Sequence, residues 1–191
     1  MRYKQEEFTE GSIFHFYNKT QKNKLLFLED SDFLYFLAKF KHNLNKYLAE
    51  VYAYCLMPNH FHFCLKQNSD KKIFRIFNDT LTSYALHYNS KYDYKGTLMQ
   101  GKLQHKKIKS EEYLILLCKY IHHNPVKSFL VDHVDDWQYS NYLEWIGKRK
   151  GELFSIEIIE NYKDDLVYYA KDLAEYAAYI NEKNFIELLF D

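Results

Sequence analysis

Apolar and polar residues alternate in some stretches of the chain and recur with a helical period in others. The alternating stretches are rich in β-branched and aromatic residues and predict four strands, over residues 12–18, 51–57, 60–67 and 97–109, the last bent at Gly101. The stretches with apolar residues three and four positions apart predict three amphipathic helices, over residues 30–48, 71–92 and 110–124. Pro58-Asn59 is a turn pair, so the second and third strands are expected to form a hairpin.

The ends of the third helix are predicted by its flanking residues. Ser110 is a favourable N-cap, and Glu111 and Glu112 fall in the first turn, where the helix dipole favours acids. Pro125 disfavours helical geometry at the residue before it, so the helix is expected to end near Asn124. The element order strand, helix, strand, strand, helix, strand, helix predicts a ferredoxin-like α+β fold, an antiparallel sheet with helices packed on it and one extra helix.

The length of 191 residues suits one full hydrophobic core. We therefore expect one domain over residues 1–150, followed by an acidic, helical C-terminal extension over 151–191 that is not an independent domain. The polar N-terminus predicts no signal peptide, and no apolar run is long enough to predict a membrane span. The three cysteines form no Cys-x-x-Cys pair, and reduced, buried cysteines favour a cytoplasmic location.

The formal net charge is zero, but the charges are unevenly distributed. Residues 66–109 hold ten basic and three acidic residues, whereas residues 151–191 hold three basic and ten acidic residues. A basic middle segment suggests a polyanionic partner such as nucleic acid. The alternative is a solvated surface whose charge is uneven without functional meaning.

His60-Phe61-His62 lies within the third predicted strand. Residues two apart on a strand project from the same face, so both imidazoles share one face and Phe61 lies on the other. Neutral imidazole is the commonest side-chain metal ligand, so this strand offers half of a metal site. The alternative is that the two histidines lie on a half-exposed strand and have no function, since the pattern is short and common.

Tyr120 and Asn124 are the second chemically suggestive pair. Four residues apart, they share one face of the third helix near its C-terminal end. The amide oxygen of Asn124 could complete a two-histidine metal site, and a phenol beside a divalent cation could ionise and become a nucleophile. The alternative is that Tyr120 is one of 19 tyrosines, on an amphipathic helix, and Asn124 a C-terminal cap.

Taken together, these segments resemble a known family. Residues 57–62 (Met-Pro-Asn-His-Phe-His) resemble the HUH signature of single-tyrosine transposases, a hydrophobic residue between two histidines. Residues 120–127 (Tyr-Ile-His-His-Asn-Pro-Val-Lys) resemble the tyrosine helix of the REP-associated tyrosine transposases, a branch of the insertion-sequence-200-like transposase family. Further similar segments follow the family's order, namely 13–27, 96–102 (its Gly-x-Leu-Phe-Gln-Gly-Arg) and 137–142 (its Trp-x-x-Ser-Ser-Tyr). The resemblance covers about residues 8–147.

The resemblance implies an enzyme that cleaves and rejoins single-stranded DNA next to hairpins. It implies that His60, His62 and Asn124 bind a divalent cation and that Tyr120 attacks the scissile phosphate, giving a 5′-phosphotyrosine. Mg²⁺ or Mn²⁺ suits this chemistry, and the two imidazoles fit Mn²⁺ on ligand grounds. Zinc is possible by ligand type but is less suited to the reaction.

The expected partner is single-stranded or hairpin DNA, with no membrane, and the family's members include both monomers and homodimers. The residues expected to contact DNA are basic ones beside the tyrosine helix and at the start of the long helix, namely Lys102, Lys106, Lys107, Lys109 and Arg75. Lys102 stands where the family has an arginine, so it meets phosphate as a point charge without bidentate geometry.

Two other functions stay open from the sequence. A ferredoxin-like sheet rich in aromatic residues can bind single strands without cutting them, so the chain could be a non-catalytic nucleic-acid-binding module. A metal-dependent phosphodiesterase that activates water would use the same histidines and leave Tyr120 with a structural role.

Overall fold

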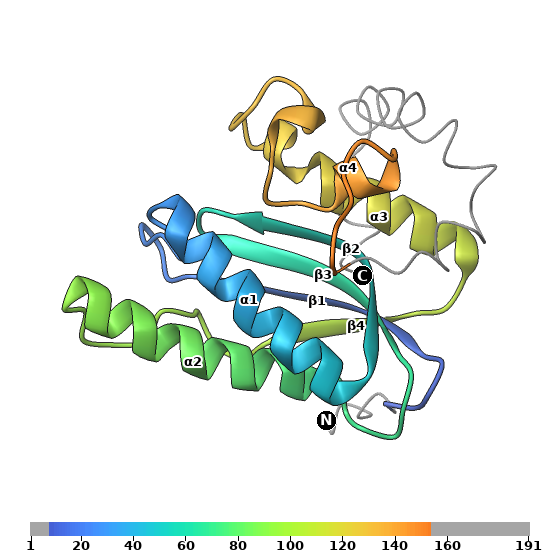
Figure 1. The fold of residues 1–191 in the computed structure, drawn as a ribbon, viewed down its shortest axis with the longest axis horizontal. Coiled ribbons are helices and arrows are strands. Elements are labelled where there is room, and N and C mark those ends of the chain that lie inside the picture. Colours follow the sequence, from blue (N-terminus) through green and yellow to red (C-terminus); the bar gives the residue numbers. More distant parts are fainter. Residues whose placement is uncertain (1–7, 154–191) are drawn as a thin grey trace.

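The computed structural model describes residues 8–153 of the chain (Figure 1). The elements, in chain order, are β1 (Ile13–Lys19), α1 (Asp30–Tyr47), β2 (Ala49–Met57), β3 (His60–Gln67), α2 (Phe74–Tyr92), β4 (Gln104–Ile108), α3 (Glu111–Lys127), the 3₁₀ helix η1 (Val134–Asp136) and α4 (Tyr142–Trp145). The strands form one antiparallel sheet in the order β2-β3-β1-β4. The predicted ferredoxin-like α+β fold is confirmed, and the predicted helical extension after residue 153 lies outside the described residues.

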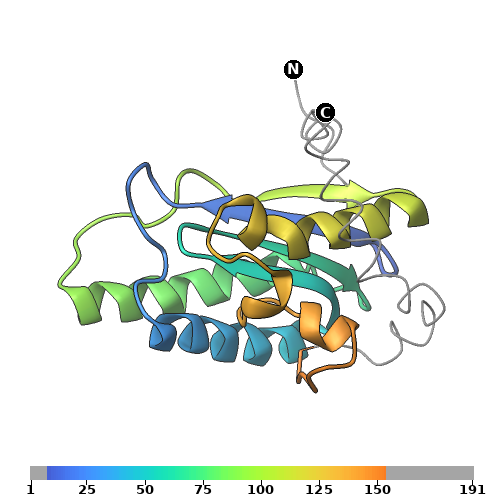
Figure 2. The same ribbon diagram turned by 90° about the horizontal axis from the view of Figure 1, so that it is seen from above.

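A hydrophobic layer covers each face of the sheet. Helices α1 and α2 cover one face, and α3 with α4 covers the other (Figures 1 and 2). On β3, Phe61, Phe63 and Leu65 pack with α1 and α2, whereas Cys64 packs with α3. A slip of β3 by one residue would turn three buried apolar side chains to the wrong face, so this packing fixes the face on which the histidines lie.

Helix α3 continues past Pro125, so the prediction that it ends near Asn124 is wrong. Proline has no N–H, and the Ile121 carbonyl therefore lacks its usual donor from residue 125. The Asn124 side chain compensates, since its Nδ2 donates to the Tyr120 carbonyl at 2.8 Å and lies 3.4 Å from the Ile121 carbonyl. The helix then ends at Lys127.

The fourth strand is shorter than the alternation predicts, since β4 begins only at Gln104 and ends at Ile108. The preceding loop makes a single bridge to the sheet, between Met99 and Thr20. Gly101 adopts a φ of 71°, a left-handed backbone conformation that interrupts an extended strand. Helix α2 likewise begins at Phe74 and not at the predicted residue 71.

The segment after α3 is bound to the edge of the sheet. The Asn141 side chain accepts from the Tyr54 amide at 2.7 Å and donates to the Tyr52 carbonyl at 3.0 Å, so it occupies the free edge of β2. His122 of α3 lies with its Nε2 3.0 Å from the same Asn141 Oδ1. These bonds tie α3 to the sheet within one chain. Within residues 8–153, none of the helices combines the length and hydropathy that a membrane span requires.

Candidate active site

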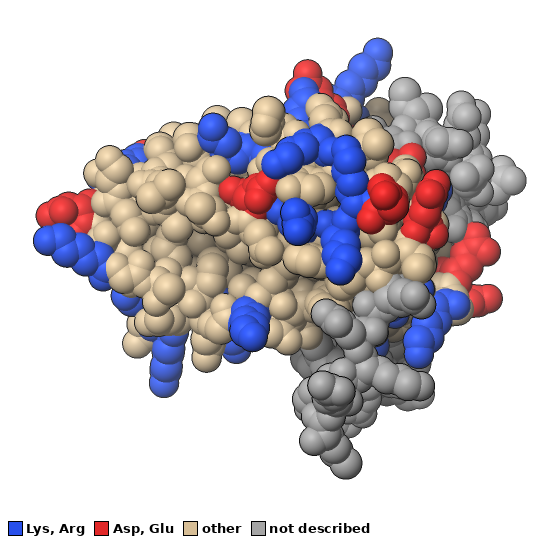
Figure 3. All heavy atoms as spheres, turned by 90° about the horizontal axis from the view of Figure 1, so that it is seen from below, with Lys and Arg blue, Asp and Glu red and all other residues tan. Residues whose placement is uncertain are grey.

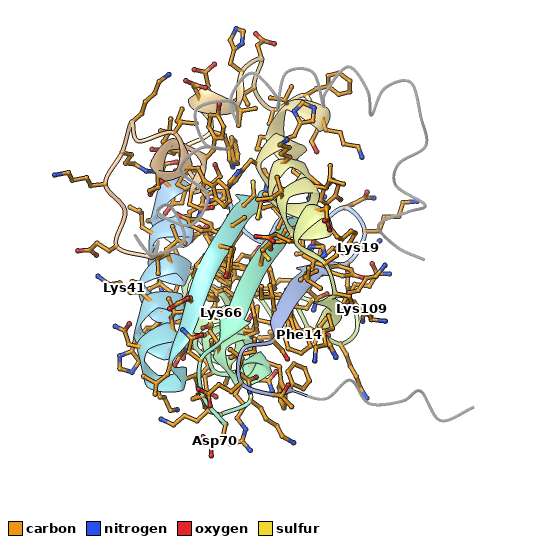
Figure 4. All side chains as sticks on the ribbon, turned by 90° about the vertical axis from the view of Figure 1, so that its right-hand side faces the viewer. Phe14, Lys19, Lys41, Lys66, Asp70 and Lys109 are labelled. Carbon is orange, nitrogen blue, oxygen red and sulfur yellow. The ribbon has the colours of Figure 1, made fainter. Side chains whose placement is uncertain are left out.

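A cavity of about 530 Å³ lies on the α3 face of the sheet, where β1 and β3 meet α3. Its lining residues come from five segments and comprise Tyr17, Asn18, Lys19, Asn59, His60, His62, Gln100, Gln104 and Tyr120. Lys19, labelled in Figure 4, is at the end of β1 and shares this cavity with Tyr120. No acidic residue is among these described lining residues.

His60 is the first residue of β3 and lies directly after the hairpin turn. Its Nδ1 donates to the Asn59 Oδ1 at 2.6 Å. Burial lowers the pKa of His60 to about 4, although a hydrogen bond with Asn124 acts in the opposite direction. The imidazole is therefore neutral near pH 7, and the bond to Asn59 puts its proton on Nδ1.

His62 contacts a second histidine that the sequence reasoning did not single out. Its Nδ1 lies 3.0 Å from Nε2 of His15 on β1, and the side chains are only 5% and 2% exposed. Burial lowers the pKa of His15 to about 3 and lowers that of His62 well below its usual range, with His15 adding to the effect. Both rings are therefore neutral, and one nitrogen of the pair donates to the other. The sequence pattern that could have identified His15 is the alternation along the first strand, which places His15 on the same face as Tyr17.

Tyr120 lies at the same cavity as both histidines of β3. Its ring centroid is 5.5 Å from that of His62, with the ring planes at 80°, and the residue is 7% exposed. Burial raises the pKa of Tyr120 to about 12, with a smaller opposing effect from hydrogen bonding to Asn124. The Lys127 Nζ is 5.5 Å from the centroid of the Tyr120 ring. The residues predicted as metal ligands and nucleophile are thus brought together.

Asn124 is oriented by the helix that carries it. Its Nδ2 donates to the Tyr120 and Ile121 carbonyls of α3, so its Oδ1 is the atom of the amide that these bonds leave over. Hydrogen bonding with the Asn124 side chain raises the pKa of His60 and lowers that of Tyr120. An amide oxygen in this orientation is a hard neutral ligand. The same bonds that carry the helix past Pro125 therefore direct the Asn124 oxygen.

The donor set fits a divalent cation. His60 and His62 each have Nδ1 within hydrogen-bond distance of a neighbour, which is the arrangement found around histidine metal ligands. A tautomer with the proton on Nδ1 would present Nε2 to a cation. Residues 8–153 contain no group of three His, Cys, Asp or Glu side chains placed to hold a metal, and within this range the Asn124 oxygen could serve beside the two imidazoles. Two imidazoles and an amide suit Mn²⁺ well and Mg²⁺ less well.

The lysines expected to contact DNA do not share one face of β4, and their contact with DNA stays a prediction. Lys102 precedes β4 and Lys109 follows it. The Lys106 Nζ lies 5.7 Å from the Tyr113 ring of α3, whereas the Lys107 Nζ lies 5.9 Å from the Phe14 ring on the opposite face. Successive residues of a strand point to opposite faces, which explains the separation.

The positive charge of residues 66–109 is also partly neutralised. Lys91 forms ion pairs with Asp32, at 2.8 Å, and with Glu29, and Lys66 lies 3.8 Å from Glu50. Arg75 is exposed on α2. On the face seen in Figure 3, basic side chains gather near the middle with acidic ones beside them. The count of charges in the sequence therefore overstates the charge available to a partner.

The antiparallel sheet with helices on both faces, together with the cavity that holds the histidines and Tyr120, defines the protein as a ferredoxin-like α+β domain with a polar cavity on the α3 face. Residues 11–124 match the family model described as "Transposase IS200 like". Because this match spans more than half of the 191 residues, the chain belongs to the IS200-like transposase family. The resemblance inferred from the sequence motifs is thereby confirmed.

The chain is similar to individual proteins of known sequence or structure. A Haemophilus influenzae protein named as a REP-associated tyrosine transposase is 28% identical over 147 residues, which is 71% of this chain and 82% of that protein. A solved REP-associated tyrosine transposase, bound to a REP hairpin, superposes with a TM-score of 0.65 at 15% identity, covering 83% of this chain and 96% of that one. A Deinococcus radiodurans protein named as a transposase gives 0.41 at 16% identity, covering 64% and 97%.

Proposed function

We propose that this protein is a DNA transposase that cleaves and rejoins single-stranded DNA next to hairpins through a 5′-phosphotyrosine. The observation that carries the proposal is that Tyr120 of α3 shares one cavity with His60 and His62 of β3. A nucleophile and a pair of metal ligands on separate elements meet at one place, as covalent phosphoryl transfer requires.

In this reaction, His60, His62 and Asn124 would hold Mg²⁺ or Mn²⁺, and the bound cation would supply Lewis-acid polarisation of the scissile phosphate. The Tyr120 oxygen gives its proton to solvent as it attacks phosphorus and forms a new O–P bond. The bond from phosphorus to the 3′ oxygen breaks, and that oxygen takes a proton from solvent. The products are a 5′-phosphotyrosine and a free 3′-hydroxyl. A 3′-hydroxyl can later attack the phosphotyrosine and release Tyr120, so the reaction rejoins strands without another energy source.

Hairpin DNA is the substrate class that we propose. The solved transposase of the same fold is bound to a REP hairpin, and the Haemophilus relative is named for the same elements. The lining of the cavity suits such a polyanion, because it includes Lys19 and no acidic residue among the described positions.

We also propose that one chain carries a complete active site. Asn141 fastens the segment after α3 to the edge of β2, and His122 links α3 to the same asparagine. Tyr120 reaches the histidines of its own sheet through this arrangement. A monomer is then sufficient for cleavage, and a homodimer would not need to exchange the tyrosine helix.

A covalent adduct tests the proposed function directly. The full-length protein is incubated with labelled single-stranded DNA that carries a hairpin, with Mn²⁺ or with EDTA, and analysed on denaturing gels. The expected result is an SDS-resistant adduct with Mn²⁺ only, and peptide mass spectrometry should locate the nucleotide on Tyr120. Cleavage without an adduct would favour a hydrolase that uses water, and binding without cleavage under any metal would favour a non-catalytic module.

Metal and DNA are expected to strengthen each other's binding. His60, His62 and Asn124 are neutral ligands, so a divalent cation at the cavity keeps a charge that a phosphate oxygen of DNA can neutralise. We expect saturating hairpin DNA to raise the affinity for Mn²⁺ by about 5- to 150-fold, the usual range of a coupling free energy. Titration calorimetry of the Tyr120→Phe protein, with and without DNA, measures this. Equal Mn²⁺ affinity in both titrations would contradict the expectation.

His15 is expected to position His62 for metal binding. The His15→Ala protein should bind Mn²⁺ about 10- to 100-fold more weakly, the usual loss when a hydrogen-bond partner of a metal ligand is removed. His15→Gln should restore part of the loss, because its amide oxygen can accept from His62 Nδ1. His42→Ala, at an exposed histidine of α1, is the control. Mn²⁺ titration followed by electron paramagnetic resonance gives the affinity, and unchanged affinity in His15→Ala would exclude the role.

A further inference from the structure

A second cavity, of about 540 Å³, lies between α2 and the loop that precedes β4. It is on the opposite face of the sheet from the histidines of β3, because His105, which lines it, lies 6.0 Å from the Phe16 ring in the core beneath α1 and α2. Nothing in the reaction described above uses this cavity.

The cavity has an aromatic wall. The Phe8 ring stands edge-on to the Phe74 ring, with centroids 5.2 Å apart, and lies 5.0 Å from the His105 ring. Asn78 and Thr82 of α2 place polar side chains along the same cavity. Aromatic planes with a few polar groups are the features that bind unpaired bases, each base gaining about 1–3 kcal/mol from stacking.

The two cavities meet at the end of β1. Asn18 lines both, and the loop before β4 separates them, with Gln100 on the side of the histidines and Lys102 on the aromatic side. Gly101 lies between these two residues with φ 71°, and nothing is within 4 Å of where its Cβ would be. A DNA backbone can therefore pass close to the chain at Gly101 from one cavity to the other.

We propose that the second cavity binds an unpaired base of the single strand that flanks the scissile phosphate. The strand would leave the catalytic cavity at Asn18, cross Gly101 with a phosphate near Lys102, and place one base against Phe8, Phe74 and His105. The described lining contains no acidic residue, which suits a polyanion and disfavours a basic peptide. This inference rests on the proposed function for its DNA substrate and adds to it a site for the flanking strand.

The test removes single bases from the DNA flank and combines these changes with substitutions in the protein. Hairpin oligonucleotides carry one abasic site, moved stepwise along the single-stranded flank, and bind the full-length Tyr120→Phe protein in Mn²⁺, so that the DNA stays intact. We expect one flanking position, near the scissile phosphate, at which loss of the base weakens binding about 5- to 150-fold. The additional substitution Phe74→Ala should weaken binding to intact DNA to a similar extent and make the abasic site harmless.

Two further variants keep the result interpretable. His105→Ala changes an exposed side chain of the cavity and should behave like Phe74→Ala even if the latter fails to fold. Leu86→Ala, at a residue of α2 that is 68% exposed and outside the cavity, should retain both the affinity and the abasic effect. The proposal would be overturned if no abasic position weakened binding. It would also be overturned if the losses of affinity from Phe74→Ala and from the abasic site were additive when the two changes are combined.

The adduct assay on the same oligonucleotides separates this inference from the proposed function. A normal Tyr120 adduct with no sensitive base would refute the second cavity and leave the transposase mechanism intact. A sensitive base that depends on Phe74 and His105, with no adduct from the wild-type protein, would support the cavity and refute the proposed chemistry.

Discussion

Replacement of Tyr120 with phenylalanine is expected to abolish the protein–DNA adduct and strand cleavage while leaving the fold and hairpin binding almost unchanged. The substitution keeps the aromatic ring that packs 5.5 Å from the His62 ring and removes only the hydroxyl. If this hydroxyl attacks phosphorus, cleavage should fall by about 10³-fold or more, as in other enzymes that lose their nucleophile, although the phenol of Tyr17 lines the same cavity. Denaturing gels with end-labelled DNA give the rate, and fluorescence anisotropy gives the binding affinity.

A matched control comes from the same helix. Tyr113 of α3 is also partly buried, and burial raises its pKa too, but it does not line the cavity that holds His60. Tyr113→Phe should therefore form the adduct at nearly the wild-type rate. An adduct that persists in Tyr120→Phe and disappears in Tyr113→Phe would show that the wrong tyrosine has been assigned. Cleavage without an adduct in the wild-type protein would instead indicate hydrolysis by water.

The alternating pattern of the histidine strand was sufficient to predict its two faces. Phe61 and Phe63 had to be buried together, which left His60 and His62 on the other face, and the structure has this arrangement. The meeting of this strand with Tyr120 could not be predicted from local pattern, because 58 positions separate Tyr120 from His62. The resemblance of the motifs to the transposase family supplied that pairing, and the order β2-β3-β1-β4 with α3 above it explains how it is achieved.

Other features depended on contacts that a local pattern does not fix. His15 reaches His62 only because β1 and β3 pair with Tyr17 opposite His62, and this register is a property of the whole sheet. The length of α3 was missed because the rule for residues before proline takes no account of a side chain such as Asn124, which compensates for the missing donor. The placement of the basic residues also depended on the strand's limits, since β4 spans only Gln104–Ile108 and its successive lysines point to opposite faces.

Replacement of His62 with alanine is expected to have the next largest effect. The substitution removes a proposed metal ligand and leaves His15 without its buried partner, so Mn²⁺-dependent cleavage should fall by about 100-fold or more. Binding of hairpin DNA in EDTA should change little, since His62 is one of several residues that line the cavity. His133→Ala, at an exposed histidine outside this cavity, is the control and should cleave normally.

Thermal unfolding distinguishes a ligand role of His62 from a structural one without relying on activity. A cation that binds only the folded protein stabilises it by about 2.7 kcal/mol at a concentration 100 times its dissociation constant. Mn²⁺ should therefore raise the melting temperature of the wild-type and His133→Ala proteins and should not raise that of His62→Ala. If His62 were only part of the packing, the variant would melt at a lower temperature without metal and still gain the full Mn²⁺ shift. Equal shifts in all three proteins would remove His62 from the metal site.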